Sequence, residues 1–135
     1  VASGARCLAG GQSIESPGYH YQPTLLSEVR PEHRAWSEET FGPVMAVTAF
    51  TDDEEAIRLA NHSQFGLGCS VHGQDLERAT RVGRRIRAGT CAINDFVKSD
   101  PRMPFGGMKR SGYGIELGRE GMLEFTHARA FNVSE

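Results

Sequence analysis

Residues 44–94 read VMAVTAFTDDEEAIRLANHSQFGLGCSVHGQDLERATRVGRRIRAGTCAIN, and the alternation of apolar runs with helical patterns in this stretch decides the fold class. Residues 44–50 form a nearly continuous apolar run, which predicts a central strand covered on both faces. Residues 68–72 and 90–94 are two further strand candidates. The order strand, helix, strand, helix, strand predicts parallel pairing with right-handed crossovers. We therefore expect an α/β fold with a parallel twisted sheet and flanking helices.

The two helical patterns between these strands carry start and stop signals. Thr51 and Glu54 fit a capping box, in which the Thr side chain accepts a free backbone N–H and the Glu reaches back to the cap. Asp75 is the candidate N-cap of the second helix, and Gly89 is its candidate end. The polar face of this helix carries Arg78, Arg81, Arg85 and Arg87. These arginines could bind an anion, but we expect a plain solvated face.

Outside this stretch the patterns are shorter. Residues 6–9 and 24–29 are candidate strands on the N-terminal side. Residues 95–114 are rich in Gly and Pro, and such a loop either lines a ligand site or simply connects two elements. Residues 116–123 fit a short helix, and residues 124–133 an extended, alternating end segment.

Composition excludes several function classes. At 135 residues the chain has the length of one ordinary domain with a single core. The formal net charge of −2 offers no basic field for a nucleic acid backbone. No apolar run reaches the roughly 18 residues of a membrane span, so we expect no membrane partner and a cytoplasmic location.

The three cysteines, Cys7, Cys69 and Cys91, are odd in number and far apart in sequence. Without a CxxC pair they predict neither a disulfide framework nor a zinc site, and we expect reduced, mostly buried thiols. The histidines show no HExxH or i,i+4 pairing, so no metal site is predicted.

A set of motifs then points to a family. Residues 38–44 read EETFGPV, and downstream come Glu55-Ala56-Ile57, Phe65-Gly66-Leu67, Ile93-Asn94, PFGGMKRSG at 104–112 and Glu124-Phe125-Thr126. In order and spacing this set resembles the aldehyde dehydrogenase superfamily over about residues 3–131. Asn94, Ser99 and the run from Asp100 into PFGGMKRSGYG resemble the succinate-semialdehyde dehydrogenase group. Ile115 departs from that group, which usually carries Arg there.

The resemblance implies NAD or NADP as cofactor and a small-molecule aldehyde as substrate. It assigns cofactor contacts to Glu39, Phe41 and Leu67. The Glu39 carboxylate would accept the hydroxyls of the nicotinamide ribose, and the two apolar residues would lie near the nicotinamide. The resemblance assigns substrate contacts to Ser99 and Phe105. From the residues alone, the alternatives are a surface acid at Glu39, a loop serine at Ser99 and ordinary packing for the three apolar residues.

The resemblance also implies what these residues lack. The family's nucleophile lies in a Gly-Gln-x-Cys context that none of the three cysteines has, so no catalytic residue is assigned and the chain alone is expected to be inactive. Residues 1–123 would be the C-terminal part of the catalytic domain, and residues 124–135 a strand that joins subunits of a homo-oligomer. A chain that begins at Val1 without Met fits a partial protein. A noncatalytic assembly or binding module and an intact small protein remain alternatives.

Overall fold

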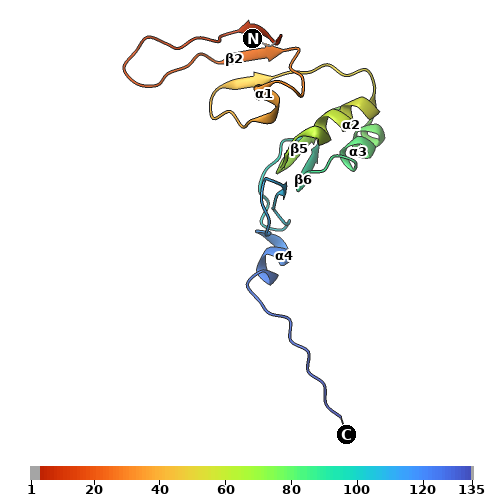
Figure 1. Ribbon diagram of the computed structural model, residues 1–135. Helices are drawn as coiled ribbons and strands as arrows, with labels where there is room; N and C mark the ends of the chain where they lie inside the picture. The colour runs from red at the N-terminus through yellow and green to blue at the C-terminus, as the bar shows by residue number, and fades with distance from the viewer. Residues whose placement is uncertain (1–3, 135) are drawn as a thin grey trace. The chain divides into compact units, whose positions relative to one another are not determined.

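The computed structural model describes residues 4–134, which fall into two compact units. The first unit ends at Ser63 and the second begins at Gln64 (Figure 1). The expectation of a single core is therefore wrong. The mixture of helices and strands agrees with the predicted α/β class.

The first unit is built on a three-stranded sheet of β1 (Arg6–Ala9), β2 (Thr24–Ser27) and β3 (Val44–Ala46), in that order. β1 has the predicted bounds and pairs with β2 antiparallel, whereas β2 and β3 are parallel. A short helix that the sequence patterns did not predict, α1 (Arg34–Ser37), follows β2. Val29, which is fully buried, follows the end of β2.

β3 differs from its prediction in length and in place. The run 44–50 was expected to be a central strand with both faces covered, but only three residues are strand and they lie at the edge of the sheet. Met45 in this strand is 65% exposed. The backbone of Val47 still donates to Leu26 of β2 at 2.8 Å, so the run stays extended along one neighbour. An apolar run indicates that other residues should pack on both faces of a strand, but it does not indicate which residues these are.

α2 (Asp53–His62) begins one residue later than the predicted cap would place it. Asp52 is the N-cap, and its carboxylate accepts from the backbone N–H of Glu55 at 2.8 Å. The Glu55 carboxylate reaches back to the backbone N–H and the hydroxyl of Thr51, each at 2.8 Å. Asp52 and Glu55 thus take the places predicted for Thr51 and Glu54, but Glu55 reaches back to the residue before the cap and not to the N–H of the cap itself, as it would in a capping box.

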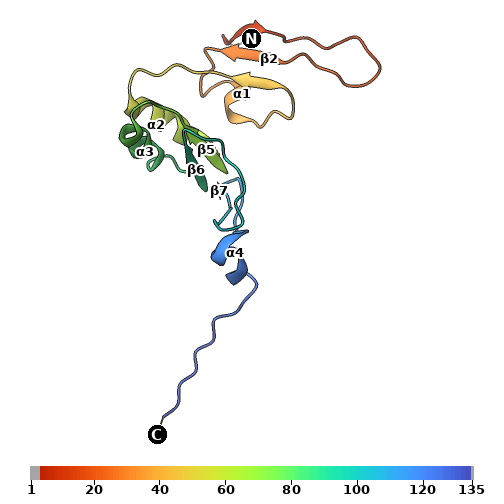
Figure 2. The same ribbon diagram turned by 180° about the vertical axis from the view of Figure 1, so that it is seen from behind.

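The second unit contains the predicted strand–helix–strand motif. β5 (Gly68–Val71) and β6 (Thr90–Ile93) are parallel, and α3 (Leu76–Gly83) connects them and packs on the pair (Figure 2). Asp75 caps α3 as predicted, accepting from the backbone N–H of Arg78 at 2.9 Å. Close packing requires glycine at the end of α3, because a Cβ on Gly83 would lie 2.8 Å from atoms of both Cys91 and Ile93.

The predicted parallel sheet is only partly present. Besides the parallel pairs β2–β3 and β5–β6, the structure has two antiparallel pairs, and the strands form three small sheets. One antiparallel pair joins β4 (Phe65–Gly66) to β7 (Met108–Lys109), a strand inside the loop predicted over 95–114. The residues of β4 and β7 lie far apart in sequence, so short-range periodicity could not predict that they pair.

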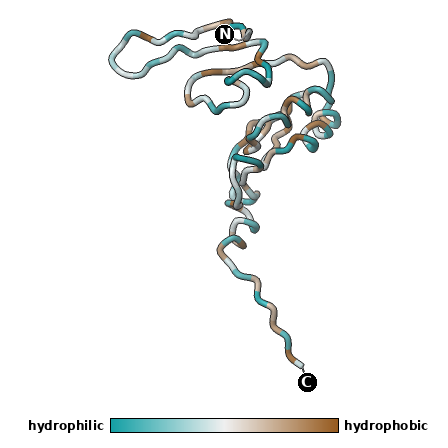
Figure 3. Tube along the Cα trace, in the orientation of Figure 1, coloured by the Kyte–Doolittle hydropathy of each residue, from teal (hydrophilic) through white to brown (hydrophobic). Residues whose placement is uncertain are grey.

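The end of the second unit has one helix and an unpaired segment. α4 (Gly118–Leu123) lies within the predicted helix 116–123. Residues 127–134 contain no strand, although polar and apolar residues alternate along them (Figure 3). The proposed role of this segment in joining subunits stays a prediction. Among residues 4–134 no helix is both long and apolar enough to cross a membrane.

Candidate functional site

Glu39 and Phe41, two of the predicted cofactor contacts, line one pocket of about 460 Å³ in the first unit. We call it the α1 pocket, because its walls come from α1, the segment after it, and β2–β3. Its lining residues are Leu26, Arg34, Ala35, Glu38, Glu39, Thr40, Phe41 and Val44. The structure therefore brings together two residues that the motif EETFGPV places two positions apart.

α1 is fixed at both ends, which positions the residues that follow it. At its start the buried His33 accepts the backbone N–H of Arg30 at 3.0 Å through Nδ1. Within it, the Trp36 indole N–H donates to Nδ1 of His62 on α2 at 3.2 Å, and the two rings meet edge to face. Glu39 and Phe41 thus follow an anchored helix.

The two neighbouring glutamates of the α1 pocket differ in their hydrogen bonding. Arg34 donates two hydrogen bonds of 2.8 Å to the two oxygens of Glu38, which lowers the pKa of that carboxyl below its usual value. Glu39 is exposed and has no hydrogen bond or ion pair within the described part of the chain. Of the two, Glu39 is the carboxylate with both oxygens available to hydroxyl donors.

Phe41 lies at a sharp turn and is 93% exposed. The backbone N–H of Gly42 donates to Thr40 at 2.9 Å, and that of Val44 donates to Gly42 at 2.8 Å. These tight turns hold the ring at the pocket edge without covering it. The ordinary packing alternative for Phe41 is not what this unit shows.

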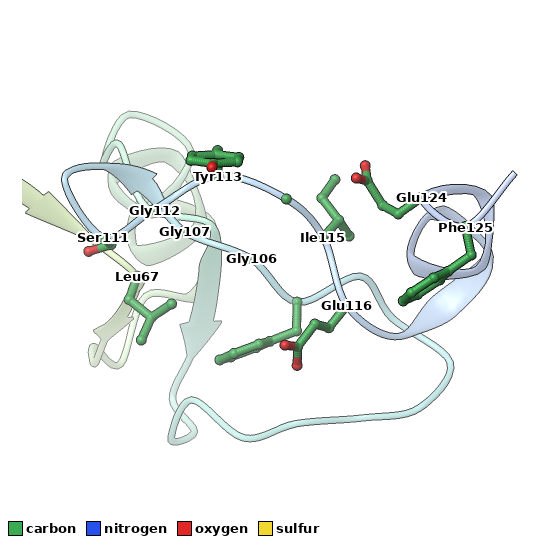
Figure 4. A pocket seen from close by; sticks show the side chains of 12 residues that line it. Leu67, Gly106, Gly107, Ser111, Gly112, Tyr113, Ile115, Glu116, Glu124 and Phe125 are labelled. Carbon is green, nitrogen blue, oxygen red and sulfur yellow. The ribbon is translucent and has the colours of Figure 1, made fainter. Parts of the chain in front are cut away.

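Leu67 and Phe105 line a second pocket, also of about 460 Å³, in the second unit. We call it the loop pocket, because most of its wall is the Gly-rich segment 105–116 (Figure 4). Leu67 comes from the β4–β5 connection, and α4 contributes the residues just after its end, Glu124 and Phe125. The Gly-rich segment lines a hollow in this unit, and its role in binding a ligand stays a prediction.

Several close approaches hold the loop pocket in shape. Phe105 and Glu116 exchange two backbone hydrogen bonds of 2.7 Å. The Ser111 hydroxyl accepts the backbone N–H of Gly66 at 2.9 Å, which ties the loop to the residue before Leu67. Gly89 is required where β6 begins, because a Cβ there would overlap the carbonyl oxygen of Gly106.

Asn94 fixes the end of β6, where the chain enters the loop. Its side chain accepts the backbone N–H of Gly73 at 2.8 Å and donates to the carbonyl of Gly73 at 2.9 Å. Its φ of 53° lies in the left-handed region that Asn tolerates better than most residues. The asparagine of the motif Ile93-Asn94 therefore has a structural role in this unit.

Ser99, the other predicted substrate contact, is exposed and is not among the residues that line the loop pocket. Its stretch of chain carries two local ion pairs, Lys98 with Asp95 at 2.7 Å and Arg102 with Asp100 at 2.7 Å. The structure does not bring Ser99 and Phe105 into one pocket.

Sequence reasoning missed the ionisable residues that complete both pockets. In the α1 pocket these are Arg34 and Glu38, whose i,i+4 spacing is the signal that could have revealed α1. In the loop pocket they are Glu116 and Glu124. Ile115, where the resembled group carries Arg, also lines the loop pocket, so no cation stands among its lining residues.

The cysteines are less buried than expected, because Cys7 and Cys91 are exposed and Cys69 is half-buried. Burial, followed by a hydrogen bond with Cys91, raises the pKa of the Cys69 thiol to about 12. Such a thiol is a poor nucleophile at neutral pH. Within residues 4–134 no group of three His, Cys, Asp or Glu side chains could hold a metal ion.

Comparisons with known proteins agree on one family. Residues 1–131 match the Aldehyde dehydrogenase family. The chain is 49% identical over 129 residues to the probable succinate-semialdehyde dehydrogenase [NADP(+)] of Synechocystis sp., covering 96% of this chain and 28% of that protein. It is also 49% identical over 138 residues to the succinate-semialdehyde dehydrogenase [NADP(+)] of Deinococcus radiodurans, covering 100% of this chain and 29% of that protein.

Solved structures give the same picture. The NAD-dependent aldehyde dehydrogenase from Sinorhizobium meliloti superimposes with a TM-score of 0.85 at 46% identity, covering 92% of this chain and 25% of that one. The betaine aldehyde dehydrogenase from Staphylococcus aureus, in complex with NAD+, gives a TM-score of 0.86 at 39% identity over 92% of this chain and 25% of that one. The chain thus spans less than a third of the length of each of these four relatives.

Proposed function

Because this chain belongs to the aldehyde dehydrogenase family, we propose that it forms part of the catalytic domain of an NAD(P)-dependent enzyme that oxidises succinate semialdehyde to succinate. The cofactor accepts the hydride in this chemistry when it is bound. The chain's own contribution is to position the cofactor and to shape the aldehyde pocket. The names of the two relatives at 49% identity support this choice of substrate.

The main support for this proposal is that the Glu39 carboxylate has no hydrogen-bond partner among the described residues. This carboxylate is unpaired on a pocket edge, whereas the adjacent Glu38 is held by Arg34. A free carboxylate can accept two neighbouring ribose hydroxyls, and each such charged hydrogen bond contributes about 1.5–3 kcal/mol. Phe41 on the same pocket offers a flat apolar face to the nicotinamide. Leu67, which lines the loop pocket, is the third proposed cofactor contact.

The substrate side is proposed for Phe105 and Ser99. An aromatic wall at Phe105 would limit the access of water to the reacting carbon. The Ser99 hydroxyl could donate to the distal carboxylate of the substrate. Lys98 and Arg102 flank it, but Asp95 and Asp100 neutralise them. Further positive charge for the substrate carboxylate would then come from residues outside this chain.

The reaction needs a cysteine thiolate that attacks the aldehyde and forms a thioester, which water later hydrolyses. None of the three cysteines has the sequence context of that nucleophile, and Cys69 is held as a neutral thiol. We therefore propose that the 135 residues alone do not turn over substrate. NAD and NADP both remain in the proposal, since these residues include no contact to the adenosine end that distinguishes them.

We propose a homo-oligomer for the enzyme, with residues 124–135 as the joining strand. A noncatalytic assembly module derived from this fold is the second candidate. Two observations, the unpaired end segment and the absence of the nucleophile's sequence context from the three cysteines, fit the assembly module as well as they fit a part of an enzyme. The two candidates differ in one property, which is whether these residues support turnover when a nucleophile and a nucleotide-binding domain are supplied.

A chimera tests this difference. Residues 4–131 would replace the matching stretch of the Synechocystis relative, and reduction of NADP would be followed spectroscopically with succinate semialdehyde. We expect turnover within about tenfold of the unmodified relative, because a tenfold change corresponds to only about 1.4 kcal/mol in the barrier. The separate 135-residue chain serves as the inactive control. A chimera that folds and binds NADP but oxidises no aldehyde would support the assembly module.

A further inference from the structure

Cys69 and Cys91 are 22 positions apart in sequence, but the fold places them opposite each other. They are register partners on the parallel strands β5 and β6. Paired residues of neighbouring strands lie about 4.8 Å apart, which falls within the Cα separation of about 4.4–6.8 Å that disulfides require. Side chains of paired residues also leave the sheet on the same face.

The environment of the two sulfurs keeps them together. After burial, the neighbouring Cys91 contributes to the raised pKa of the Cys69 thiol. α3 packs on the same face, and Gly83 approaches Cys91 so closely that a Cβ there would lie 2.8 Å from the sulfur. A side chain at position 83 would therefore displace Cys91, and glycine leaves its sulfur in place.

We propose that Cys69 and Cys91 form a dithiol site that hydrogen peroxide oxidises to an intramolecular disulfide. This modification is separate from the proposed dehydrogenase reaction and does not depend on it. A metal is a poorer occupant, because a tetrahedral soft-metal site needs further ligands and no third ligand joins the pair among the described residues.

The order of events follows from exposure. Cys91 is exposed and meets the oxidant first, and its thiolate attacks one peroxide oxygen, which forms a sulfenic acid and releases water. The half-buried Cys69 lies opposite that sulfur, gives up its thiol proton to water, and attacks the sulfenic sulfur as the thiolate. The S–S bond forms, and the hydroxide leaves and takes up the proton as a second water. Two thiols and one peroxide thus give one disulfide and two waters.

Peptide mapping of the reduced, peroxide-treated chain tests the proposal directly. The expected product has lost two of its three thiols and contains the tryptic peptides 59–78 and 88–98 joined by a disulfide. Cys7→Ser is the matched control, because it removes an exposed thiol outside the pair and should leave this product unchanged. Oxidation without the joined peptides, or a disulfide that includes Cys7, would overturn the proposal.

Two variants separate the roles of the sulfurs. Cys69→Ser should stop at a sulfenic acid on Cys91 that a dimedone probe traps. Cys91→Ser should slow the loss of the Cys69 thiol at least tenfold, because the remaining sulfur is a protonated thiol. Equal rates in the two variants would contradict the proposed order.

A denatured sample of the wild-type chain provides the control that needs no variant. In guanidinium the three cysteines should join in all pairings, whereas the folded chain should give the Cys69–Cys91 bond at least tenfold in excess over the others. Mixed pairings from the folded chain would show that the strands do not direct the reaction and would overturn the proposal.

Discussion

Glu38 and Glu39 carry the same side chain and are both exposed, yet Arg34 holds only the first. This difference arises from helix geometry, since residue 38 is four positions after Arg34 and residue 39 lies beyond the last turn of α1. The proposed binding role therefore depends on which of two identical residues the helix leaves unpaired.

At Glu39 we predict a specific loss of cofactor binding. In the active chimera, Glu39→Gln should raise the KM for NADP about tenfold to hundredfold, because charged hydrogen bonds contribute about 1.5–3 kcal/mol and each 1.4 kcal/mol is a factor of ten. The KM for the aldehyde should change little. Steady-state kinetics with varied cofactor measures both. Glu32→Gln removes the same charge outside the pocket and should change neither constant. A similar rise in both variants would point to a general charge effect.

At Cys69 we predict a loss of stability in alkaline solution. The folded chain holds the thiol proton up to a pKa of about 12, whereas the unfolded chain releases it near the ordinary value of 9.0. The unfolded state then binds fewer protons, so stability falls as pH rises from about 9 to about 12. Urea unfolding midpoints at several pH values in this window measure the fall. Cys69→Ala should reduce the fall and Cys7→Ala should preserve it, and an unchanged fall in Cys69→Ala would exclude this thiol as its source.

At the scale of elements, the sequence predicted the helices and strands that depend on short-range patterns. β1 has the expected bounds, and β5, α3 and β6 form the expected motif with Asp75 as cap, but α3 ends at Gly83 and not near the predicted Gly89. β3 was predicted less well, because an apolar run says nothing about which neighbours are present. The β4–β7 pair was not predicted, since it depends on contacts between residues more than 40 positions apart.

In the candidate site, too, the sequence grouped neighbouring residues but not residues that long-range contacts bring together. Glu39 and Phe41 share a pocket because they are neighbours in sequence, so a motif is enough to group them. Leu67 and Phe105 line one pocket because β4 pairs with β7 and because Gly89 and Gly106 approach closely. Ser99 was grouped with Phe105 by resemblance, but local ion pairs occupy its part of the loop and it lies outside that pocket.

The cap of α2 allows a direct test of one such difference. Asp52→Ala should lower the free energy of unfolding by about 1 kcal/mol, because it removes the acceptor for the Glu55 N–H. Thr51→Ala should lower it by less than about 0.5 kcal/mol, because the backbone N–H of Thr51 still donates to Glu55. Asp52→Asn should retain most of the stability. Urea unfolding followed by circular dichroism gives the three values, and a larger loss at Thr51 than at Asp52 would restore the cap predicted from the sequence.

At the scale of the whole molecule, the exposed area is the main observation. The chain exposes 10863 Å², whereas a globular protein of 14.8 kDa exposes about 7,000 Å². Two separate globular units of half that mass would expose roughly 8,400 Å² in total by the same scaling. The excess is partly apolar and includes Phe41, Phe125 and Phe131. Large exposed apolar surface of this kind is typical of sites that bind a protein, a ligand or a membrane.

Residues 127–134 are part of this surface and form neither a helix nor a strand. Arg129 lies over the Phe131 ring at 5.7 Å, as expected when residues two apart share a face of an extended chain. Phe131 and Val133 are 79% and 72% exposed. Because residues two apart share a face of an extended chain, we expect these two on one face and Asn132 on the other. If this segment joins subunits through the face of Phe131, charge on that face should be much more harmful than charge at Asn132.

We therefore predict that the double variant Phe131→Asp with Val133→Asp weakens self-association of the chain at least tenfold. Burying each apolar side chain contributes about 1.5–3 kcal/mol, and a buried unpaired carboxylate adds a further cost. Asn132→Asp adds one charge on the opposite face and should weaken association less than threefold. Sedimentation velocity over a range of concentrations measures the dissociation constants. Equal weakening by the two variants would assign the effect to net charge, and no weakening by either would place the interface elsewhere on the exposed apolar surface.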